Sequence, residues 1–407
     1  MKTLILILRK YAKDIIDDHA KEIGTKHPID LEDMKLPYMY WLPKHHKQPV
    51  GSRFVVSGSH CTMKKLSQDI SKALRIIQKS VGFHCTYNHK FSKSSSYWII
   101  NNSSSVHENI QNINLNSTAK SVYSGDFSTL YTLIPHNQLI SRIKSMVELG
   151  YKVSNKQYIR IGRAKASWST KIPKNPKILY LTADELMECI KLLLDNLYVI
   201  FNNTVYQQVI GIPIGSNCSQ ELANLYLLSY EFDHVNQLIA DGNEEARFTE
   251  YNSRYIDDLL SLNDLGYIER VYNDIYPVDM KLNKTNILST SANYLDVHIE
   301  IIDGKFITSI YDKRKDFNFK IISLPHMSSN IPSGPAYGVY ISQVYRYFRA
   351  NNNIDGFYTE VKELSRKLVD QGFTVNKLKY HICKFFRKHF LEFTFKYWDK
   401  IDVSNCF

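Results

Sequence analysis

Two adjacent carboxylates stand in the middle of a run of residues that favour β structure. Asp257 and Asp258 belong to the sequence Arg254-Tyr255-Ile256-Asp257-Asp258-Leu259-Leu260-Ser261-Leu262. The β-favouring residues on both sides of the pair predict a tight hairpin with the acids at its tip. Carboxylate oxygens are ligands that Mg²⁺ prefers in proteins. The pair is therefore a candidate metal site, although aspartate is also common in solvated turns.

A third carboxylate, Asp126, strengthens this interpretation. It ends an alternating strand in Ser121-Val122-Tyr123-Ser124-Gly125-Asp126-Phe127, and the chain then turns into a helix. By itself Asp126 could serve only as an acid at a helix N-terminus. A glycine loop, Gly211-Ile212-Pro213-Ile214-Gly215-Ser216, and a further helix separate it from the acidic hairpin. This order supplies the separate carboxylates that transfer of a nucleotidyl group by two magnesium ions requires.

The same order is that of the palm subdomain of template-directed polymerases, and the chain resembles reverse transcriptases. Four strings carry the resemblance: Tyr255 to Asp258, Asp126 to His136, Tyr38-Met39-Tyr40-Trp41-Leu42-Pro43-Lys44-His45-His46-Lys47, and Tyr337-Gly338-Val339-Tyr340-Ile341-Ser342-Gln343. The second and third strings are most similar to those of Penelope-like retroelements. The resemblance extends from about residue 10 to the C-terminal end.

The resemblance implies an α/β (α+β) right-hand polymerase with fingers, palm and a helical thumb. Its activity would be RNA-directed DNA synthesis that extends a DNA primer on an RNA template with deoxynucleoside triphosphates. The cofactor would be two Mg²⁺ ions, with Mn²⁺ as a substitute. Asp126 and Asp257 would be the shared ligands, Asp258 a supporting one, and the carbonyl of Phe127 an oxygen donor.

Tyr131 is the residue that discriminates best between sugars. RNA polymerases with a similar palm carry an acid at this position to hold the 2′-hydroxyl, whereas reverse transcriptases carry a tyrosine or phenylalanine that excludes it. Tyr131 therefore favours deoxynucleotides as substrates. Since the chain has 28 tyrosines, a purely structural role in the core is the alternative.

The resemblance assigns further residues to the nucleotide and to the nucleic acid. The triphosphate would bind Lys44, Lys47 and Arg53, of which Arg53 suits phosphate best because a guanidinium binds it bidentately. Lys284, with Lys281 as the fallback, would protonate the pyrophosphate leaving group. Template and primer contacts are expected at Gly211, Tyr255, Tyr294, Leu295, Arg346 and Arg349, and a nucleotide contact at Gly215. Glycine would allow the backbone to approach the new base pair closely.

Composition is compatible with this function and argues against a secreted or membrane-spanning protein. The chain has 407 residues, 44% of them hydrophobic, and a net charge of +11, which suits a polyanionic partner. Residues 305–407 carry 17 Lys and Arg against 9 Asp and Glu. The six cysteines have no Cys-x-x-Cys spacing, which favours a reduced, intracellular protein, nuclear or cytoplasmic. No apolar run reaches the roughly 20 residues of a membrane span.

The resemblance implies four regions: a helical segment at 1–34, fingers at 35–118, a palm at 119–304 with an insertion at about 151–178, and a basic helical thumb at 305–407. Leu4 to Leu8 would begin the first helix. Helix signals are Thr62 as a cap, Gly150 as an end and Ser219 as a cap. A single helix is expected at 376–398, and strands at 35–60.

Two alternatives remain open from the residues. One is an RNA-dependent RNA polymerase, which Tyr131 and the Tyr-Ile-Asp-Asp turn disfavour. The other is a domesticated or decayed module that binds nucleic acid without polymerising. The three aspartates and Tyr131 are intact, which disfavours that alternative too. We see no ribonuclease H, integrase or Gly-Ile-Tyr endonuclease motif, so integration would need another protein.

Overall fold

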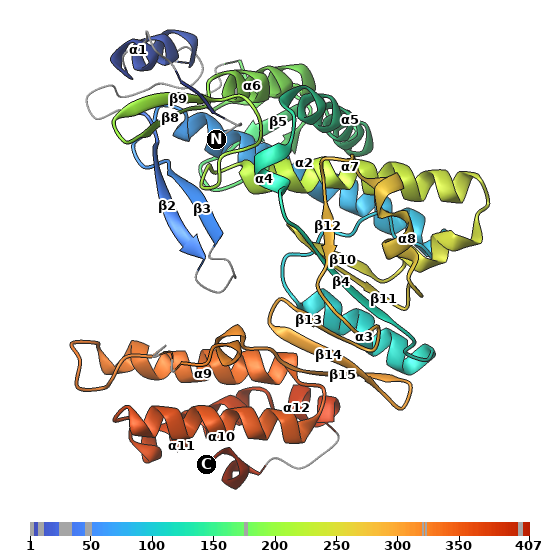
Figure 1. Cartoon of the computed structure of the whole chain (residues 1–407), viewed down its shortest axis with the longest axis vertical. Coiled ribbons are helices and arrows are strands. Elements are labelled where there is room, and N and C mark those ends of the chain that lie inside the picture. Colours follow the sequence, from blue (N-terminus) through green and yellow to red (C-terminus); the bar gives the residue numbers. More distant parts are fainter. Residues whose placement is uncertain are drawn as a thin grey trace. The chain divides into compact units, whose positions relative to one another are not determined.

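A computed structural model describes residues 4–6, 12–23, 35–44, 51–174, 178–319, 321, 324–397 and 402–407. The protein is a mixed α/β structure with 51% helix and 20% strand, which confirms the expected class (Figure 1). The chain divides into two compact units. The first comprises Met1–Ile99, Asp126–Asp257 and Glu269–Asn283, and the second Ile100–Gly125, Asp258–Ile268 and Lys284–Phe407. The boundaries of fingers, palm and thumb remain predictions.

The first unit contains most of the helices and two small sheets. Its elements are β1 (Leu4–Leu6), α1 (Ala12–Ile23), β2 (Tyr38–Lys44), β3 (Gly51–Ser57), α2 (Lys64–Ser92), α4 (Leu130–Leu133), α5 (His136–Ser154), β5 (Tyr158–Ile161), β6 (Ala166–Ser169), β7 (Tyr180–Leu181), α6 (Ala183–Asp195), β8 (Tyr198–Phe201), β9 (Thr204–Gln208), α7 (Ser219–Ala240), η1 (Glu244–Thr249) and β10 (Asn252–Tyr255). One sheet has the order β1-β9-β8-β2-β3, and the other β6-β5-β7.

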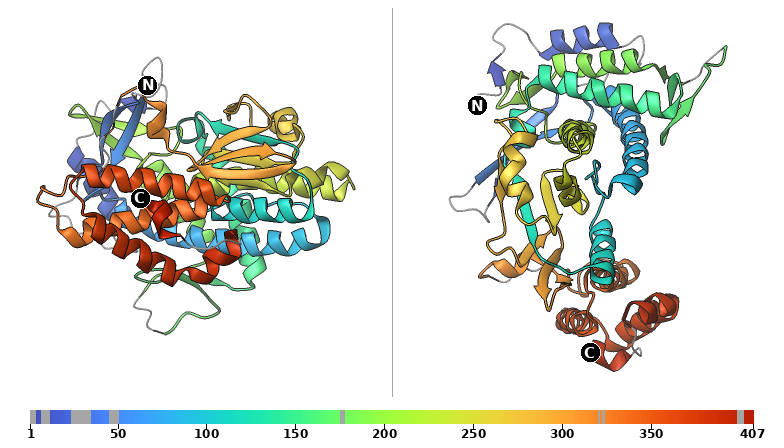
Figure 2. Two further views of the ribbon diagram at one scale, coloured as in Figure 1. Left: turned by 90° about the horizontal axis from the view of Figure 1, so that it is seen from below. Right: turned by 90° about the vertical axis from the view of Figure 1, so that its right-hand side faces the viewer.

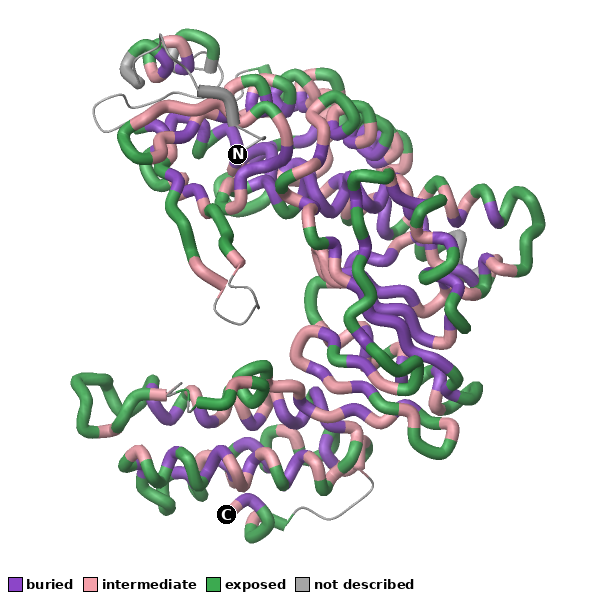
Figure 3. Tube along the Cα trace, in the orientation of Figure 1, coloured by how far each residue is buried: buried purple, intermediate pink, exposed green. Residues whose placement is uncertain are grey.

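Helices α2, α5, α6 and α7 pack together as the core of the first unit. The first half of α7 is almost entirely buried, as Figure 3 shows. The five-stranded sheet has its own small core, in which Met39, Val56 and Val199 meet. Outside that core the paired strands β2 and β3 are largely solvent-exposed, including the aromatic side chains of Tyr40, Trp41 and Phe54.

A four-stranded sheet of order β10-β11-β4-β12 carries the candidate catalytic residues. It contains β4 (Val122–Phe127), β11 (Asp258–Leu262) and β12 (Leu282–Lys284), and α8 (Tyr267–Ile275) follows β11 in the chain. The division between the units falls within β4 and β12 and in the turn between Asp257 and Asp258. This sheet contains both of the elements that the sequence predicts, the strand with Asp126 near its end and the hairpin at 254–262.

The second unit combines a meander of three antiparallel strands with a helical bundle (Figure 2). Its elements are α3 (Ser104–Asn116), β13 (Ser291–Tyr294), β14 (Val297–Ile302), β15 (Lys305–Ile310), η2 (Lys313–Asp316), α9 (Ser333–Ala350), α10 (Ile354–Asp370), α11 (Val375–Lys388), α12 (Phe390–Tyr397) and η3 (Val403–Cys406). Aromatic rings fill the bundle: Phe348 and Phe357 both pack against Phe385 and Phe393. Among the described residues, no helix is both long and apolar enough to cross a membrane.

Two of the expected helix limits at the N-terminal side are wrong. Leu4–Leu6 is a strand that pairs with β9, with Leu4 opposite Gln208, and does not begin a helix. A pairing partner so far along the sequence leaves no local signal. The hydroxyl of Thr62 hydrogen-bonds Nδ1 of His19 (2.7 Å), and helix α2 begins two residues later, at Lys64.

Two further limits differ in the helical core and in the bundle. Gly150 does not end α5, which continues to Ser154. A Cβ at Gly150 would lie 2.9 Å from Cδ1 of Ile77, so this glycine lets α5 approach α2 closely. The expected helix at 376–398 is two helices, because the backbone leaves the helical conformation at His389.

Candidate active site

Asp126 is held at the end of β4 next to a buried aromatic residue. Tyr123 and Phe127 are buried, and Asp126 between them is half-buried. The ring of Phe127 packs edge-on against Tyr276, with the ring centroids 4.8 Å apart. The amide of Phe127 donates to the carbonyl oxygen of Asp257 (2.9 Å). The strand that carries Asp126 is thus tied directly to the turn that carries Asp257.

Asp257 lies in a tight turn whose first residue is strained. β10 ends at Tyr255, and Ile256 has a φ of 58°, a left-handed conformation that β-branched residues rarely adopt. Such a conformation costs of the order of 1–3 kcal/mol and persists only where surrounding contacts impose it. The turn therefore needs support from the residues around it.

That support comes from Arg254, whose side chain is fully buried. Its guanidinium binds Glu231 on α7 through two hydrogen bonds (2.5 and 3.1 Å) and donates to the carbonyl oxygen of Ile256 (2.9 Å). Asn224 accepts two more of its hydrogen bonds, and the hydroxyl of Tyr276 donates to Glu231 (2.9 Å). This buried network fixes the backbone immediately before Asp257.

We did not predict Arg254 and Glu231 from the sequence. A signal does exist: Glu231 is the one charged residue within the stretch Leu222–Phe232 of α7, which is rich in leucine and aromatic residues, and buried charges require partners. Which partner it takes depends on tertiary structure, since the two residues are 23 positions apart.

The electrostatics of Asp257 show which charges surround it. Burial raises the pKa of its carboxyl, and the negative charge of Asp126 raises it further, whereas Arg53 and Lys44 lower it. Two carboxylates and two cations of the first unit therefore influence one another electrostatically. Lys44 is half-buried at the end of β2 and Arg53 is exposed on β3. Lys47 lies outside the described residues.

The donor set suits a hard cation that also binds phosphate. Magnesium is typically held by one or two carboxylates, with phosphate and water oxygens completing its coordination. Asp126 and Asp257 provide two carboxylates. Burial and the charge of Asp126 raise the pKa of Asp257 and so disfavour its ionised form, which a bound cation would stabilise. Within the described ranges no group of three or more His, Cys, Asp or Glu side chains has the geometry of a complete metal site.

Tyr131 lies on α4, close to the charges of this site. Burial raises the pKa of its phenol, and the charge of Asp257 raises it further, while Arg53 lowers it. Its carbonyl oxygen accepts a hydrogen bond from the amide of Ile212 in the glycine loop (2.7 Å). The half-buried Tyr131 is therefore influenced by the charge of Asp257, and its backbone is bonded to that loop.

The glycine loop is held against two neighbouring backbones. A Cβ at Gly211 (φ 78°) would lie 2.5 Å from the carbonyl oxygen of Tyr131, and one at Gly215 (φ 112°) would lie 2.2 Å from that of Val56. The carbonyl oxygen of Ile214 accepts from the amide of Val56 (2.8 Å). Close packing within the protein thus already requires both glycines, and the exposed Gly215 remains a predicted nucleotide contact.

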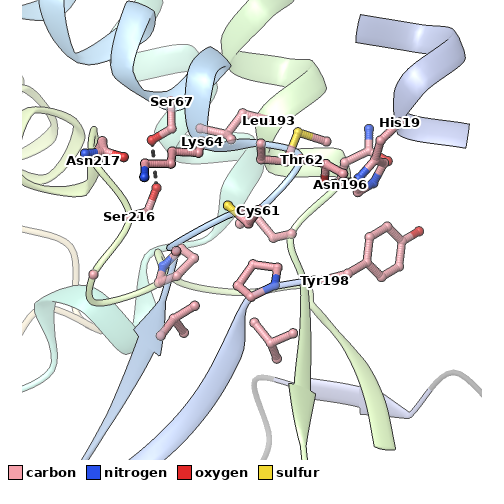
Figure 4. A pocket seen from close by; sticks show the side chains of 18 residues that line it. His19, Cys61, Thr62, Lys64, Ser67, Leu193, Asn196, Tyr198, Ser216 and Asn217 are labelled. Atoms are coloured by element: carbon pink, nitrogen blue, oxygen red, sulfur yellow. Dashed lines mark hydrogen bonds between the residues drawn. The ribbon is translucent and has the colours of Figure 1, made fainter. Parts of the chain in front are cut away.

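A small cavity lies behind the glycine loop, between the start of α2 and strand β8 (Figure 4). Ser67 and Ser216 hydrogen-bond each other across one side of it (2.9 Å). Its volume of about 40 Å³ is far too small for a nucleotide. Ser219, which we expected to cap α7, instead donates to the carbonyl oxygen of Pro213 (2.7 Å), and Cys218 precedes the helix. Hydrogen bonds therefore hold the glycine loop at both Ser216 and Pro213.

The remaining predicted residues belong to the sheet strands and the second unit. Tyr255 is half-buried at the end of β10, while Lys281 and Lys284 are exposed. Asp258 begins β11, and its carbonyl oxygen accepts from the hydroxyl of the buried Tyr294 (3.2 Å). Leu295 has a φ of 52° in the turn between β13 and β14, which confirms the expected turn.

The two arginines of α9 differ from each other. We expected both to be exposed, but Arg346 is half-buried in an ion pair with Asp296 (2.9 Å). Burial alone would raise the pKa of Asp296, yet the hydrogen bonds from Arg346 and Ser103 hold it below its ordinary value. Arg349 is exposed and lies over the ring of Tyr345.

No protein-family model matches the sequence. No curated protein matches it either. Among solved structures, the chain is similar to telomerase from Candida albicans in complex with a TWJ fragment of telomeric RNA. The TM-score is 0.57 and the identity 11%, over 97% of this chain and 67% of that one. Apo telomerase from Candida tropicalis gives a TM-score of 0.48 and 9% identity, over 95% and 64% of the two chains.

The first of these similarities defines the fold. The chain shares the fold of the telomerase chain in the first of these structures. It corresponds to about two thirds of the length of those telomerase chains.

Proposed function

We propose that the protein is an RNA-directed DNA polymerase that extends a primer with deoxynucleoside triphosphates. The observation that carries the proposal is the meeting of Asp126 and Asp257 with the cations Arg53 and Lys44 in one unit of a reverse-transcriptase-like fold. Paired carboxylates and facing cations are what transfer of a nucleotidyl group from a triphosphate requires.

Asp126 and Asp257 would hold magnesium, with the carbonyl oxygen of Phe127 as a further donor and Asp258 in support. When bound, two such ions lower the pKa of the primer 3′-hydroxyl and neutralise charge on the leaving pyrophosphate. Metal binding depends on ionised carboxylates, and Arg53 and Lys44 favour the ionised form of Asp257.

The other residues would bind and orient the nucleotide. The guanidinium of Arg53 and the ammonium groups of Lys44 and Lys47 suit the triphosphate. Lys284, or Lys281 in its place, would donate a proton to the departing pyrophosphate. Gly215 would face the new nucleotide, because the loop backbone there is exposed.

Tyr131 would determine sugar choice. Its ring lies beside Asp257 and Arg53 and would occupy the space that a 2′-hydroxyl needs. Since the backbone of Tyr131 is bonded to the glycine loop, its ring position is well defined. Deoxynucleotides would therefore be preferred over ribonucleotides.

Template and primer would be contacted by the turn residue Leu295, by Tyr255 and by the arginines of α9. Gly211 and Tyr294, which we also expected to contact them, are buried in the structure. Of the two arginines, Arg349 is the better candidate because it is exposed, whereas Arg346 is paired with Asp296. The strings shared with Penelope-like elements support an origin in a mobile retroelement, with a separate protein for endonuclease or integration steps.

The test is primer extension with the purified protein on RNA and DNA templates, comparing deoxy- and ribonucleotides in the presence of Mg²⁺. Extension on RNA with deoxynucleotides supports the proposal. Extension only with ribonucleotides supports an RNA polymerase, and binding without extension supports a module that has lost catalysis.

A further inference from the structure

The segment between Glu148 and Asp184 has a charge pattern that the polymerase site does not use. It contains eight Lys and Arg and no Asp or Glu, a local charge of +8 in a chain whose total is +11. Its cationic residues are Lys152, Lys156, Arg160, Arg163, Lys165, Lys171, Lys174 and Lys177. Lys177 lies outside the described residues. The other seven are all exposed.

None of these seven cations forms an ion pair with another residue in the described part of the chain. By contrast, Lys315 on the second unit is bound to both Glu360 and Glu363. Like charges that gather on one surface repel each other unless an anionic partner or salt compensates them. The segment is therefore an exposed cationic surface whose charge is available for an anionic partner.

Strands β5, β6 and β7 give this surface a flat platform. Ile159 and Ile161 are buried toward α2, where the indole of Trp168 donates to the hydroxyl of Ser80 (3.0 Å). Lys72 on α2 also donates to the carbonyl oxygen of Gly162 (3.2 Å). One face of the sheet thus packs on the helices. The β5–β6 hairpin, green in Figure 2, extends away from these helices.

The opposite face of the sheet presents tyrosines around a central arginine. Because strand side chains alternate, Tyr158 and Arg160 share the face away from Ile159. Tyr180 on β7 is the direct cross-strand partner of Arg160, and Ser167 on β6 is its partner on the other side. Both tyrosines are partly exposed. Aromatic rings beside cations on a sheet suit stacking on unpaired bases with contacts to phosphates.

We propose that this outer face of the β6-β5-β7 sheet, with Tyr158, Arg160 and Tyr180, binds a single-stranded segment of nucleic acid together with Arg163 and Lys165 of the β5–β6 turn. The surface is distinct from the carboxylate site. The charges that act on Asp257 come from Asp126, Arg53 and Lys44, and none comes from this segment. The inference goes beyond the proposed polymerase activity and does not depend on it, since binding needs neither nucleotides nor magnesium.

The test uses an unstructured, adenine-rich RNA oligonucleotide and the full-length chain without nucleotides. The variant Arg160→Gln/Arg163→Gln/Lys165→Gln should reduce affinity at low salt by about tenfold or more. It should also flatten the log–log salt dependence by about two units, since each lost phosphate contact on a single strand removes about 0.7. The control Lys79→Gln/Lys144→Gln/Lys191→Gln removes three exposed cations elsewhere in the first unit and should leave the slope unchanged.

A second variant tests stacking. Tyr158→Ser should weaken binding of the RNA by about fivefold or more, with no comparable loss for duplex DNA, because paired bases cannot stack on the ring. An unchanged salt slope in the triple variant would overturn the proposal. Equal losses for RNA and duplex DNA, or equally tight binding to vesicles containing phosphatidylserine, would overturn the assignment to a single strand.

The polymerase proposal and this one can fail separately. If wild-type protein does not extend primers but the triple variant still loses RNA affinity, only the proposed function fails. If extension on a short template is intact in the variant and RNA affinity is also intact, only the surface assignment fails.

Discussion

The guanidinium of Arg254 and the carboxylate of Glu231 form an ion pair from which solvent is fully excluded, since both side chains are 0% exposed. The same guanidinium donates to the carbonyl oxygen of Ile256, whose φ of 58° is unfavourable for a β-branched residue. Ile256 immediately precedes Asp257. We infer that the pair holds the turn, and thereby the carboxylate, in place.

Breaking this pair should be costly for both stability and activity. Arg254→Met leaves Glu231 buried without its cation and should lower the free energy of unfolding by about 3–5 kcal/mol, as chemical denaturation would measure. In Arg254→Met/Glu231→Met the unpaired charge is gone, so much of the stability should return. Primer extension should not return, because the support of Ile256 is still missing. Full extension by a stable double variant would contradict the positioning role.

The glycine loop allows a matched pair of substitutions. Gly215 and Gly242 both have positive φ, but a Cβ at Gly215 would lie 2.2 Å from the carbonyl oxygen of Val56, whereas nothing lies within 4 Å at Gly242. Gly242→Ala should therefore show only the cost of the left-handed conformation, about 1–2 kcal/mol. Gly215→Ala should lower the free energy of unfolding clearly more. Equal losses of unfolding free energy in the two variants would mean that strand β3 moves aside for the added methyl group without an energetic penalty.

The second unit should lose stability in mild acid because of His107. Burial, together with the charge of Lys396, lowers the pKa of this histidine to about 4. Between pH 6.5 and 4 the unfolded chain thus binds a proton that the folded chain does not, so stability falls as pH falls through this window. The contribution is at most about 3 kcal/mol.

The measurement is the free energy of unfolding from pH 7 to 4 for wild type and His107→Leu. Leucine cannot take up the proton, so its curve should be flatter over this window. Identical pH dependences for the two proteins would assign the acid sensitivity to other groups.

Tyr131→Ala tests the basis of sugar choice. Removing the ring should open space for a 2′-hydroxyl, so the ratio of kcat/KM for deoxy- over ribonucleotide should fall at least about tenfold, or about 1.4 kcal/mol. The change should come mainly from better use of ribonucleotides. The control Tyr180→Ala changes a partly exposed tyrosine on a strand of the same unit and should leave the ratio unchanged. An unchanged ratio in Tyr131→Ala would show that Tyr131 does not determine sugar choice.

What the sequence predicted was local, and what it missed depended on distant contacts. The strand ending on Asp126 and the Asp257 hairpin were predictable because β propensity and turn residues there agree with the fold. The partner of Leu4 at Gln208 left no mark in the local sequence. Gly150 looked like a helix end, yet it is a packing position against Ile77.

The candidate site shows the same difference between features that are predictable from the local sequence and features that depend on distant contacts. Residue types indicated the carboxylates and the cations as candidates, because their chemistry is specific. The ion pair of Arg346 with Asp296 was not predictable, since the sequence of helix α9 does not show that Arg346 lies next to the β13–β14 turn. Its expected exposure was wrong for that reason.

The central claim is that Asp126 and Asp257 carry out the chemistry of nucleotide addition, and single-turnover primer extension on an RNA template tests it most directly. We expect Asp126→Ala and Asp257→Ala each to abolish extension while primer–template affinity stays within a few-fold of wild type, because affinity rests on phosphate contacts. Asp241→Ala, an exposed acid of the same unit, is the control and should extend normally. Extension at the wild-type rate by either active-site variant would contradict the claim.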